Sequence, residues 1–199
     1  ASEQVVFDSL PDQSHVALRQ NSKLIYPENF NGKERRVSLE GEAFFDVAKD
    51  SERPFNVYTG DFVTTAIGTA FNINSYQDGE NGISVALVKG KVRVKKTDLQ
   101  TDALAGDKEY ILLPGRKAQY DPQSKTFSLS DFDVNAETAW KEGNLLFANA
   151  EAPEVFTRLE RWYGVKIKFQ NASSKRINYS AEFKNQNIHQ VLTSLSFTL

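Results

Sequence analysis

Two glutamates, Glu40 and Glu42, stand two positions apart in the segment RVSLEGEAFFDV (36–47). In a β-strand such residues share one face, about 7 Å apart at ~3.3 to 3.4 Å per residue. Glycoside hydrolases use carboxylate pairs at similar distances, but there the two groups flank a cleft from opposite sides. Neighbours on one polar face are typical of solvated side chains. We therefore predict no catalytic residue and keep a hydrolase as the less favoured alternative.

Other catalytic or metal-binding patterns are missing from the sequence. It contains no cysteine, which excludes disulfides, thiolate metal sites and cysteine nucleophiles. The two histidines, His15 and His189, fall in different predicted domains and have no clustered ligands around them. Nucleophile-elbow, zinc-helix and phosphate-loop motifs do not occur. We predict no metal and no cofactor.

Composition limits the possible partners. The 199 residues are 40% hydrophobic and 12% aromatic, enough to build a buried core. Lys and Arg total 24 against 26 Asp and Glu, so the net charge of -2 gives no reason to expect nucleic acid or an anionic membrane as partner. The basic run VKGKVRVKK (88–96) indicates a solvated strand face. No apolar run is long enough to span a membrane. Because the chain begins with Ala and has no Met, we expect a soluble piece of a longer protein.

Residues 1–132 have the pattern of an all-β domain. Apolar residues alternate with polar ones through 37–47 and 63–73, and turn signals such as QDGENG (77–82) separate the runs. We predict a β-sandwich or a β-roll. LEGEAFFDV (39–47) and VKGKVRV (88–94) share a pattern that aligns Gly41 with Gly90, and the apolar phase flips just before Gly90. A bulge or sharp bend next to Gly90 would explain the flip.

Residues 140–199 are predicted to form a small α/β domain, joined to the first by a linker at 133–139. An apolar stripe from Pro153 to Tyr163 predicts a helix that ends at Gly164. FANAEAPEVFTRL (147–159) aligns with FKNQNIHQVLTSL (183–195), which predicts two repeated strand–helix–strand units with a period of 36. The strand predicted at 165–169 would then have its counterpart near position 201, so we expect the last strand to be missing.

A sheet that lacks one strand has an open edge that can pair with a neighbour. The strand INYSAEF (177–183) is the candidate, and on it we predict a possible partner contact at Ile177, Tyr179 and Ala181.

The blocks LPDQSHVALRQNSKLIYPENF (10–30), RRVSLEGEAFFDVAKDSERPFNV (35–57), VTTAIGTAFNI (63–73), SVALVKGKVRV (84–94) and LLPGRKAQYD (112–121) resemble, in order, the FecR family of anti-sigma factors. The region from 143 to 169 is similar to the C-terminal domain that follows FecR, which is related to the short signalling domains of secretins and TonB-dependent receptors. The resemblance covers nearly the whole chain. Its motif positions, to which we assign a structural role, are Gly41, Glu42, Ala43, Gly68, Gly90 and Gly115. Gln13 and Arg19 depart from it, since the family usually has Gly and Asn there.

The resemblance implies a single-pass inner-membrane protein with this chain as its periplasmic part. Its partners would be the N-terminal signalling domain of a TonB-dependent outer-membrane receptor and, through a cytoplasmic segment absent here, an extracytoplasmic-function sigma factor. The membrane would be reached only through an absent transmembrane segment. In this context Gly41 and Gly90 would allow a bend or a close backbone approach, and Glu42 would be a polar outward residue or a local hydrogen-bond acceptor.

A different class of function stays open beside this one. The β-domain could be a periplasmic carbohydrate- or ligand-binding module without a signalling role, holding a glycan on Phe44, Phe45 and Tyr58. Phe44 stands out of phase with its apolar neighbours, which is the sequence feature that favours this alternative.

Overall fold

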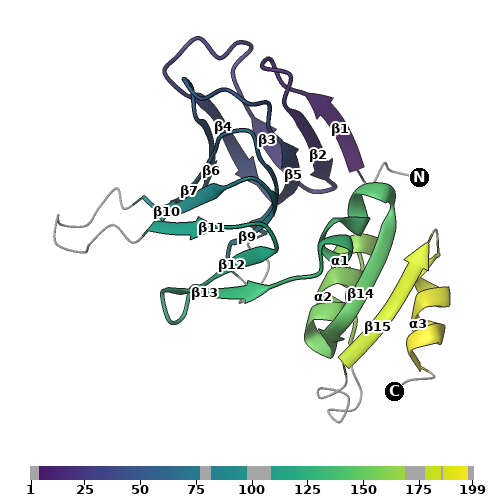
Figure 1. Ribbon diagram of the computed structural model, residues 1–199. Coiled ribbons are helices and arrows are strands. Elements are labelled where there is room, and N and C mark those ends of the chain that lie inside the picture. The colour runs from purple at the N-terminus through teal and green to yellow at the C-terminus, as the bar shows by residue number, and fades with distance from the viewer. Residues whose placement is uncertain (1–4, 77–81, 98–108, 169–177, 185, 197–199) are drawn as a thin grey trace. The chain divides into compact units, whose positions relative to one another are not determined.

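The computed structural model describes residues 5–76, 82–97, 109–168, 178–184 and 186–196 (Figure 1). The chain divides into two compact units, Ala1–Val134 and Asn135–Leu199, described below as unit 1 and unit 2. The fold is mainly β, with a small α/β part at the C-terminal end. Residues 133–139, which we expected to be a linker, include the short helix α1 (Val134–Thr138).

Unit 1 is a β-sandwich of two sheets (Figure 1). All neighbouring strands are antiparallel except β4 and β6, which run parallel. The seven-stranded sheet contains, in spatial order, β1 (Val5–Ser9), β2 (His15–Arg19), β5 (Glu42–Asp46), β8 (Ala70–Asn74), β9 (Ser84–Lys89), β12 (Arg116–Asp121) and β13 (Thr126–Asp131). The six-stranded sheet contains β11 (Glu109–Leu112), β10 (Val92–Lys96), β7 (Phe62–Ala66), β6 (Phe55–Thr59), β4 (Arg35–Glu40) and β3 (Lys23–Ile25).

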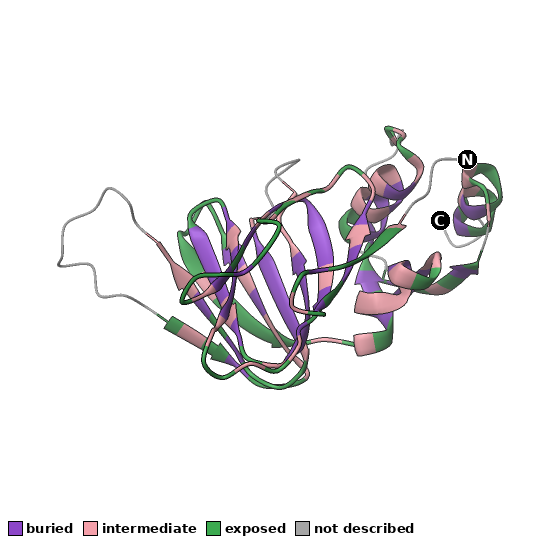
Figure 2. Ribbon diagram, turned by 90° about the horizontal axis from the view of Figure 1, so that it is seen from above, coloured by how far each residue is buried: buried purple, intermediate pink, exposed green. Residues whose placement is uncertain are grey.

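The core fills the space between the two sheets. Strand alternation sends every second side chain inward, and aromatic residues join the sheets. Phe45 of β5 stacks on Phe71 of β8 at 5.4 Å between ring centroids, and it also lies 5.9 Å from Phe55 of β6 in the opposite sheet. All three are fully buried. Figure 2 shows buried residues concentrated along the strands and exposed residues in the connecting loops.

The chain passes repeatedly from one sheet to the other, and the predicted glycine positions lie at these crossings. Gly41 separates β4 from β5, and Gly90 separates β9 from β10, each time with a change of sheet. Their φ angles are 96° and 91°, a conformation that side chains disfavour. Gly68, between β7 and β8, and Gly115, between β11 and β12, stand at two further crossings.

A bulge next to Gly90 is confirmed. In the pairing of β8 with β9, Ala70 lies opposite Lys89 and Phe71 opposite Leu87, so the register skips Val88. The extra residue reverses the in–out phase of the strand just before the crossing, which explains the phase flip in the sequence.

The prediction that Glu40 and Glu42 share one strand face is wrong. Strand β4 ends at Glu40 in the six-stranded sheet, and β5 begins at Glu42 in the seven-stranded sheet. The alternation of the sequence continues across Gly41 because both strands bury every second residue in the same core. Periodicity therefore cannot reveal that the backbone changes sheets between them.

Unit 2 contains α1, a 3-10 turn (Ala139–Glu142), β14 (Asn144–Glu151), α2 (Ala152–Tyr163), β15 (Asn178–Lys184) and α3 (Ile188–Ser196). Strands β14 and β15 pair antiparallel (Figure 1). Helix α2 matches the predicted apolar stripe, with Val155, Leu159 and Trp162 buried, and Gly164 ends it in a left-handed conformation. No helix among the described residues is long and apolar enough to cross a membrane.

The strand predicted at 165–169 does not form in its described part, since 165–168 have no regular secondary structure. Glu160 of α2 explains this locally. Its carboxylate accepts a hydrogen bond from the backbone N–H of Ile167 at 2.7 Å and lies 3.2 Å from Lys166 Nζ. The segment is therefore bonded to the end of the helix, and one of its backbone donors is already used.

We expect Gly41→Ala to destabilise unit 1 strongly. An added Cβ would lie 2.4 Å from Ser22 Oγ and 2.8 Å from Ser22 Cα, at a φ of 96°. Strain and overpacking together predict a loss of about 3 kcal/mol in the free energy of unfolding. Gly60→Ala is the matched control, because φ is 54° and no atom lies within 4 Å of the added Cβ; it should cost about 1 kcal/mol.

Urea unfolding followed by far-UV circular dichroism measures both variants, since Trp140 and Trp162 both belong to unit 2 and their fluorescence does not report on the sandwich. Equal losses in the two variants would contradict a steric requirement at the Gly41 crossing.

Candidate functional site

Glu42 is not on a solvated face, and this corrects one of our two expectations for it. Glu42 is 3% exposed and Arg19 is 5% exposed. Arg19 Nη1 lies 2.6 Å from Glu42 Oε2. Asn72 Nδ2 donates a second hydrogen bond to Glu42 Oε1 at 3.0 Å. Glu42 is thus a local hydrogen-bond acceptor within a buried ion pair. By alternation with Phe45 it points away from the sandwich core, but not into solvent.

The Gly41 crossing is tied to its surroundings by main-chain groups. The backbone N–H of Glu42 donates to Ser22 Oγ at 2.9 Å, and Gly41 O accepts from both N and Oγ of Ser75, each at 2.8 Å. Ser22 Oγ also bonds Tyr76 Oη at 2.9 Å. These contacts occupy the space that a side chain on Gly41 would need, so the crossing and the buried ion pair form one unit of structure.

Of the other motif residues, Gly68 and Gly90 lie at similar close approaches of the chain. Ala43 is fully buried in the core cluster. An added Cβ on Gly68 would come within 3.0 Å of Lys49 Cβ, and one on Gly90 within 2.6 Å of Thr69 Cγ2. At Gly115 the same atom would meet open space.

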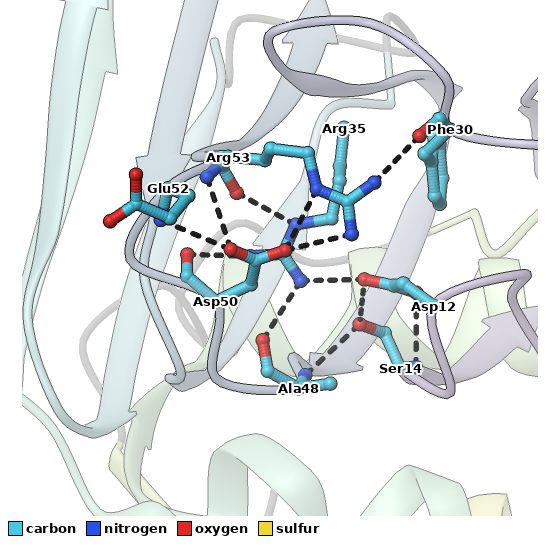
Figure 3. Close-up of polar contacts among 8 residues, drawn as sticks. All are labelled: Asp12, Ser14, Phe30, Arg35, Ala48, Asp50, Glu52 and Arg53. Carbon is cyan, nitrogen blue, oxygen red and sulfur yellow. Dashed lines mark hydrogen bonds and ion pairs between the residues drawn. The ribbon is translucent and has the colours of Figure 1, made fainter.

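A second buried cation, Arg35, holds together two loops of unit 1 (Figure 3). Arg35 is fully buried, and its Nη1 lies 2.6 Å from Asp12 Oδ2 and 2.8 Å from the carbonyl oxygen of Ala48. Its Nε donates to the carbonyl oxygen of Arg53 at 2.8 Å. Asp12 in turn accepts from both N and Oγ of Ser14. Arg35 thereby joins the first turn of the domain to the loop between β5 and β6.

That loop, KDSERP (49–54), is held in place by specific contacts of its own side chains. Arg53 bonds Asp50 at 2.8 Å and donates to the carbonyl oxygen of Phe30 at 2.7 Å (Figure 3). The hydrogen bond from Arg53 lowers the pKa of Asp50 below its ordinary value. Arg35 donates to the backbone carbonyl groups of Ala48, just before the loop, and of Arg53 within it, 13 and 18 positions away. The fold of the loop therefore depends on a residue for which the sequence carries no local signal.

In unit 2, the predicted contact residues divide into different environments. Ile177 lies outside the described residues. Tyr179 is 3% exposed, so its side chain is internal, and its ring packs edge-on against Phe156 at 6.5 Å. Burial raises the pKa of Tyr179. Ala181 is half-buried, and the exposed side chains of β15 are those of the opposite phase, including Ser180 and Glu182.

The three aromatic residues proposed for a glycan site do not form one surface. Phe45 is fully buried between the sheets, whereas Phe44 points to the other face of β5. Tyr58 belongs to β6 in the opposite sheet, where the guanidinium of Arg36 lies 3.9 Å from its ring centroid. Within the described ranges, no three His, Asp or Glu side chains gather as metal ligands.

In unit 1 the buried charged groups Arg19, Glu42 and Arg35 are paired and hold turns together. Unit 2 is a small two-stranded sheet with helices. Many unrelated functions share such folds, so the comparisons with known proteins identify the family.

The comparisons name the family. The model of the FecR protein family matches residues 3–93, and that of the FecR C-terminal domain matches residues 144–199. The chain belongs to the FecR family of anti-sigma factors. Two crystal structures of a Parabacteroides distasonis protein assigned as an anti-sigma factor are similar to it, each at 27% identity over 98% of this chain. The two alignments cover 87% and 86% of the Parabacteroides distasonis chains, with TM-scores of 0.82 and 0.81. No curated protein matches. The family and these neighbours support a signalling role as an anti-sigma factor.

We expect Arg19→Met and Glu42→Leu to be far more harmful singly than together. Removing one partner leaves a buried charge uncompensated, at a cost of about 3–5 kcal/mol, whereas replacing both with apolar groups is often close to neutral. A double-mutant cycle on urea unfolding measures this, and it should give a coupling energy above about 2 kcal/mol. Additive losses would show that the ion pair does not act as a unit.

Gln13→Gly should stabilise the protein. Gln13 has a φ of 67° in the turn closed by the bond from Leu10 N to Ser14 O at 2.8 Å. A non-glycine residue in this conformation is disfavoured by about 1–2 kcal/mol, part of which glycine loses again through chain entropy. We expect a net gain of about 0.5–1 kcal/mol in urea unfolding. Gln13→Ala is the control and should show no gain; equal effects of both changes would contradict strain at this turn.

Proposed function

We propose that this chain is the periplasmic sensor and relay part of a membrane-anchored anti-sigma factor. It reads the state of a TonB-dependent outer-membrane receptor and transmits it to an extracytoplasmic-function sigma factor. The sigma factor would be bound by a cytoplasmic segment outside these 199 residues. One observation carries the proposal: the two family matches fall one in each compact unit, so the FecR sandwich and its C-terminal partner domain are separate structures on one chain.

The receptor contact belongs to unit 2 in this proposal. Strand β15 pairs with β14 along one edge, and among the described residues its other edge has no strand partner. A free edge presents backbone N–H and C=O groups that a strand of another protein can pair with. Ser180 and Glu182 are exposed on this strand. Ala181 can contribute to the contact, whereas Tyr179 supports the strand from inside.

Unit 1 would act as a rigid carrier of the signal. Its two sheets share one core, and buried ion pairs at Arg19 and Arg35 fix the turns that join them. A body of this kind responds to a force as a whole instead of deforming locally. A change at unit 2 could therefore be passed along the chain toward the membrane without a change in the shape of the sandwich.

Calorimetry tests the receptor contact directly. We expect this chain to bind the N-terminal signalling domain of a TonB-dependent receptor from the same genome with a Kd of about 1 μM or tighter, which corresponds to about −8 kcal/mol. Residues 1–134 alone should show no heat of binding, provided that circular dichroism shows them folded. Absence of binding to every such domain of the genome would overturn the relay function.

A pair of variants at one position locates the contact on the edge of β15. Glu182→Pro removes a backbone donor, whereas Glu182→Ala removes the same side chain and keeps the donor. If β15 accepts a receptor strand, affinity falls about tenfold or more in the proline variant and stays nearly unchanged in the alanine variant. Both variants must retain the Trp140 and Trp162 fluorescence of folded unit 2. Equal affinities would place the contact elsewhere.

A further inference from the structure

Unit 1 contains a hollow of about 860 Å³ at one end of the sandwich. We call it the end pocket and define it by six of its lining residues, Leu39, Glu40, Thr59, Asp61, Phe62 and Ile83. Strand β4 ends there, the β6–β7 hairpin turns there, and β9 begins there. Its volume falls within the range of small-ligand pockets.

The inner wall of the end pocket is the hydrophobic core itself. Leu39, Phe62 and Ile83 are buried members of the core cluster and also line the hollow. An apolar group that enters the pocket would thus contact side chains that belong to both sheets. Burial of such a group in contact with these residues would be favourable through the hydrophobic effect.

Thr59 places an unused hydroxyl group in this apolar setting. It follows Phe55 and Val57 in inward phase on β6, so its side chain points between the sheets toward the pocket that it lines. The residue is 3% exposed, and its Oγ1 has no hydrogen-bond partner. A buried polar group without a partner is costly, and a ligand atom that bonded it would recover that cost.

Two carboxylates stand at the rim without a positive partner. Glu40 and Asp61 are exposed, and neither side chain makes an ion pair or a hydrogen bond within the described part of the chain. Glu40 ends β4, Asp61 lies in the turn of the β6–β7 hairpin, and both line the end pocket. Lys23 lies opposite Glu40 in the β3–β4 register but forms no ion pair with it. Among the described residues, no Lys or Arg lines the pocket.

We propose that the end pocket binds an ammonium or guanidinium group carried on a short apolar stem. The stem would pack against Leu39, Phe62 and Ile83. The cation would lie at the rim between Glu40 and Asp61, within reach of the Thr59 hydroxyl. An anionic ligand would be repelled by the two carboxylates at the rim.

This site is independent of the receptor contact proposed above. It lies wholly in unit 1, whereas that contact uses β15 of unit 2. The failure of either proposal therefore leaves the other standing.

Amide chemical shifts of the complete, ¹⁵N-labelled chain test the proposal with three probes that share one stem: n-hexylammonium, n-hexanol and hexanoate. We expect n-hexylammonium to give saturable shifts at Gly60, Asp61 and Phe62. Binding of n-hexanol should be about tenfold weaker because it lacks the charge, and hexanoate should not bind. Equal binding of all three probes, or no saturable shift with n-hexylammonium, would overturn the proposal.

Variants distinguish the contribution of the two carboxylates to binding from that of the apolar wall. The double change Glu40→Gln and Asp61→Asn should weaken n-hexylammonium about tenfold and leave n-hexanol unchanged. Thr59→Val, which removes the unused hydroxyl at constant shape, should weaken n-hexylammonium several-fold while the protein remains folded. Glu28→Gln is the control, an exposed carboxylate outside the pocket, and should change nothing. A loss of equal size in the control would show that the effect is only general charge attraction.

Two peptides then distinguish the source of the cation. Acetyl-Gly-Lys-Gly-amide and its norleucine counterpart differ only in the ammonium group. Tighter binding of the lysine peptide than of n-hexylammonium would assign the pocket to a lysine of a partner protein, and weaker binding would assign it to a small free amine. Equal binding of the two peptides would contradict recognition of a cation.

Discussion

The structure of unit 1 depends on the repeated passage of the backbone from one sheet to the other. Each passage must turn the chain sharply while the neighbouring strands keep their side chains in one shared core. At Gly41 and Gly90 the backbone meets this requirement with a positive φ and with another chain segment packed where a side chain would stand. The strands, their register and the position of every inward residue follow from where these crossings lie.

The crossings also explain why charged residues are buried. A sharp turn at the end of a sheet leaves backbone carbonyl groups without ladder partners, and a buried guanidinium can supply several donors at once. Arg35 does so for Ala48 and Arg53, with Asp12 compensating its charge. Arg19 and Glu42 form the corresponding pair near Gly41. Such pairs do not add much net stability, but they favour one arrangement of the turns over others.

Gln13 and Arg19 are the two positions at which the sequence departs from the motifs that carry the resemblance, and the structure places them in different settings. Gln13 has a left-handed conformation that suits glycine, so a residue with a side chain is strained there. Arg19 instead forms the buried ion pair with Glu42. Fixed contacts of this kind suit unit 1 to moving as one body, as the proposed relay role requires.

The sequence by itself determined the periods, the turns and the family. Alternation predicted the sandwich, the phase flip before Gly90 predicted a bulge, and the stripe ending at Gly164 predicted α2, because these features depend on residues close together in the chain. The tertiary structure decided what lies far apart in sequence. Glu42 is buried because Arg19 and Asn72, 23 and 30 positions away, meet it. Within one strand, period two shows which residues share a face, but only packing decides whether that face meets solvent, as Tyr179 demonstrates.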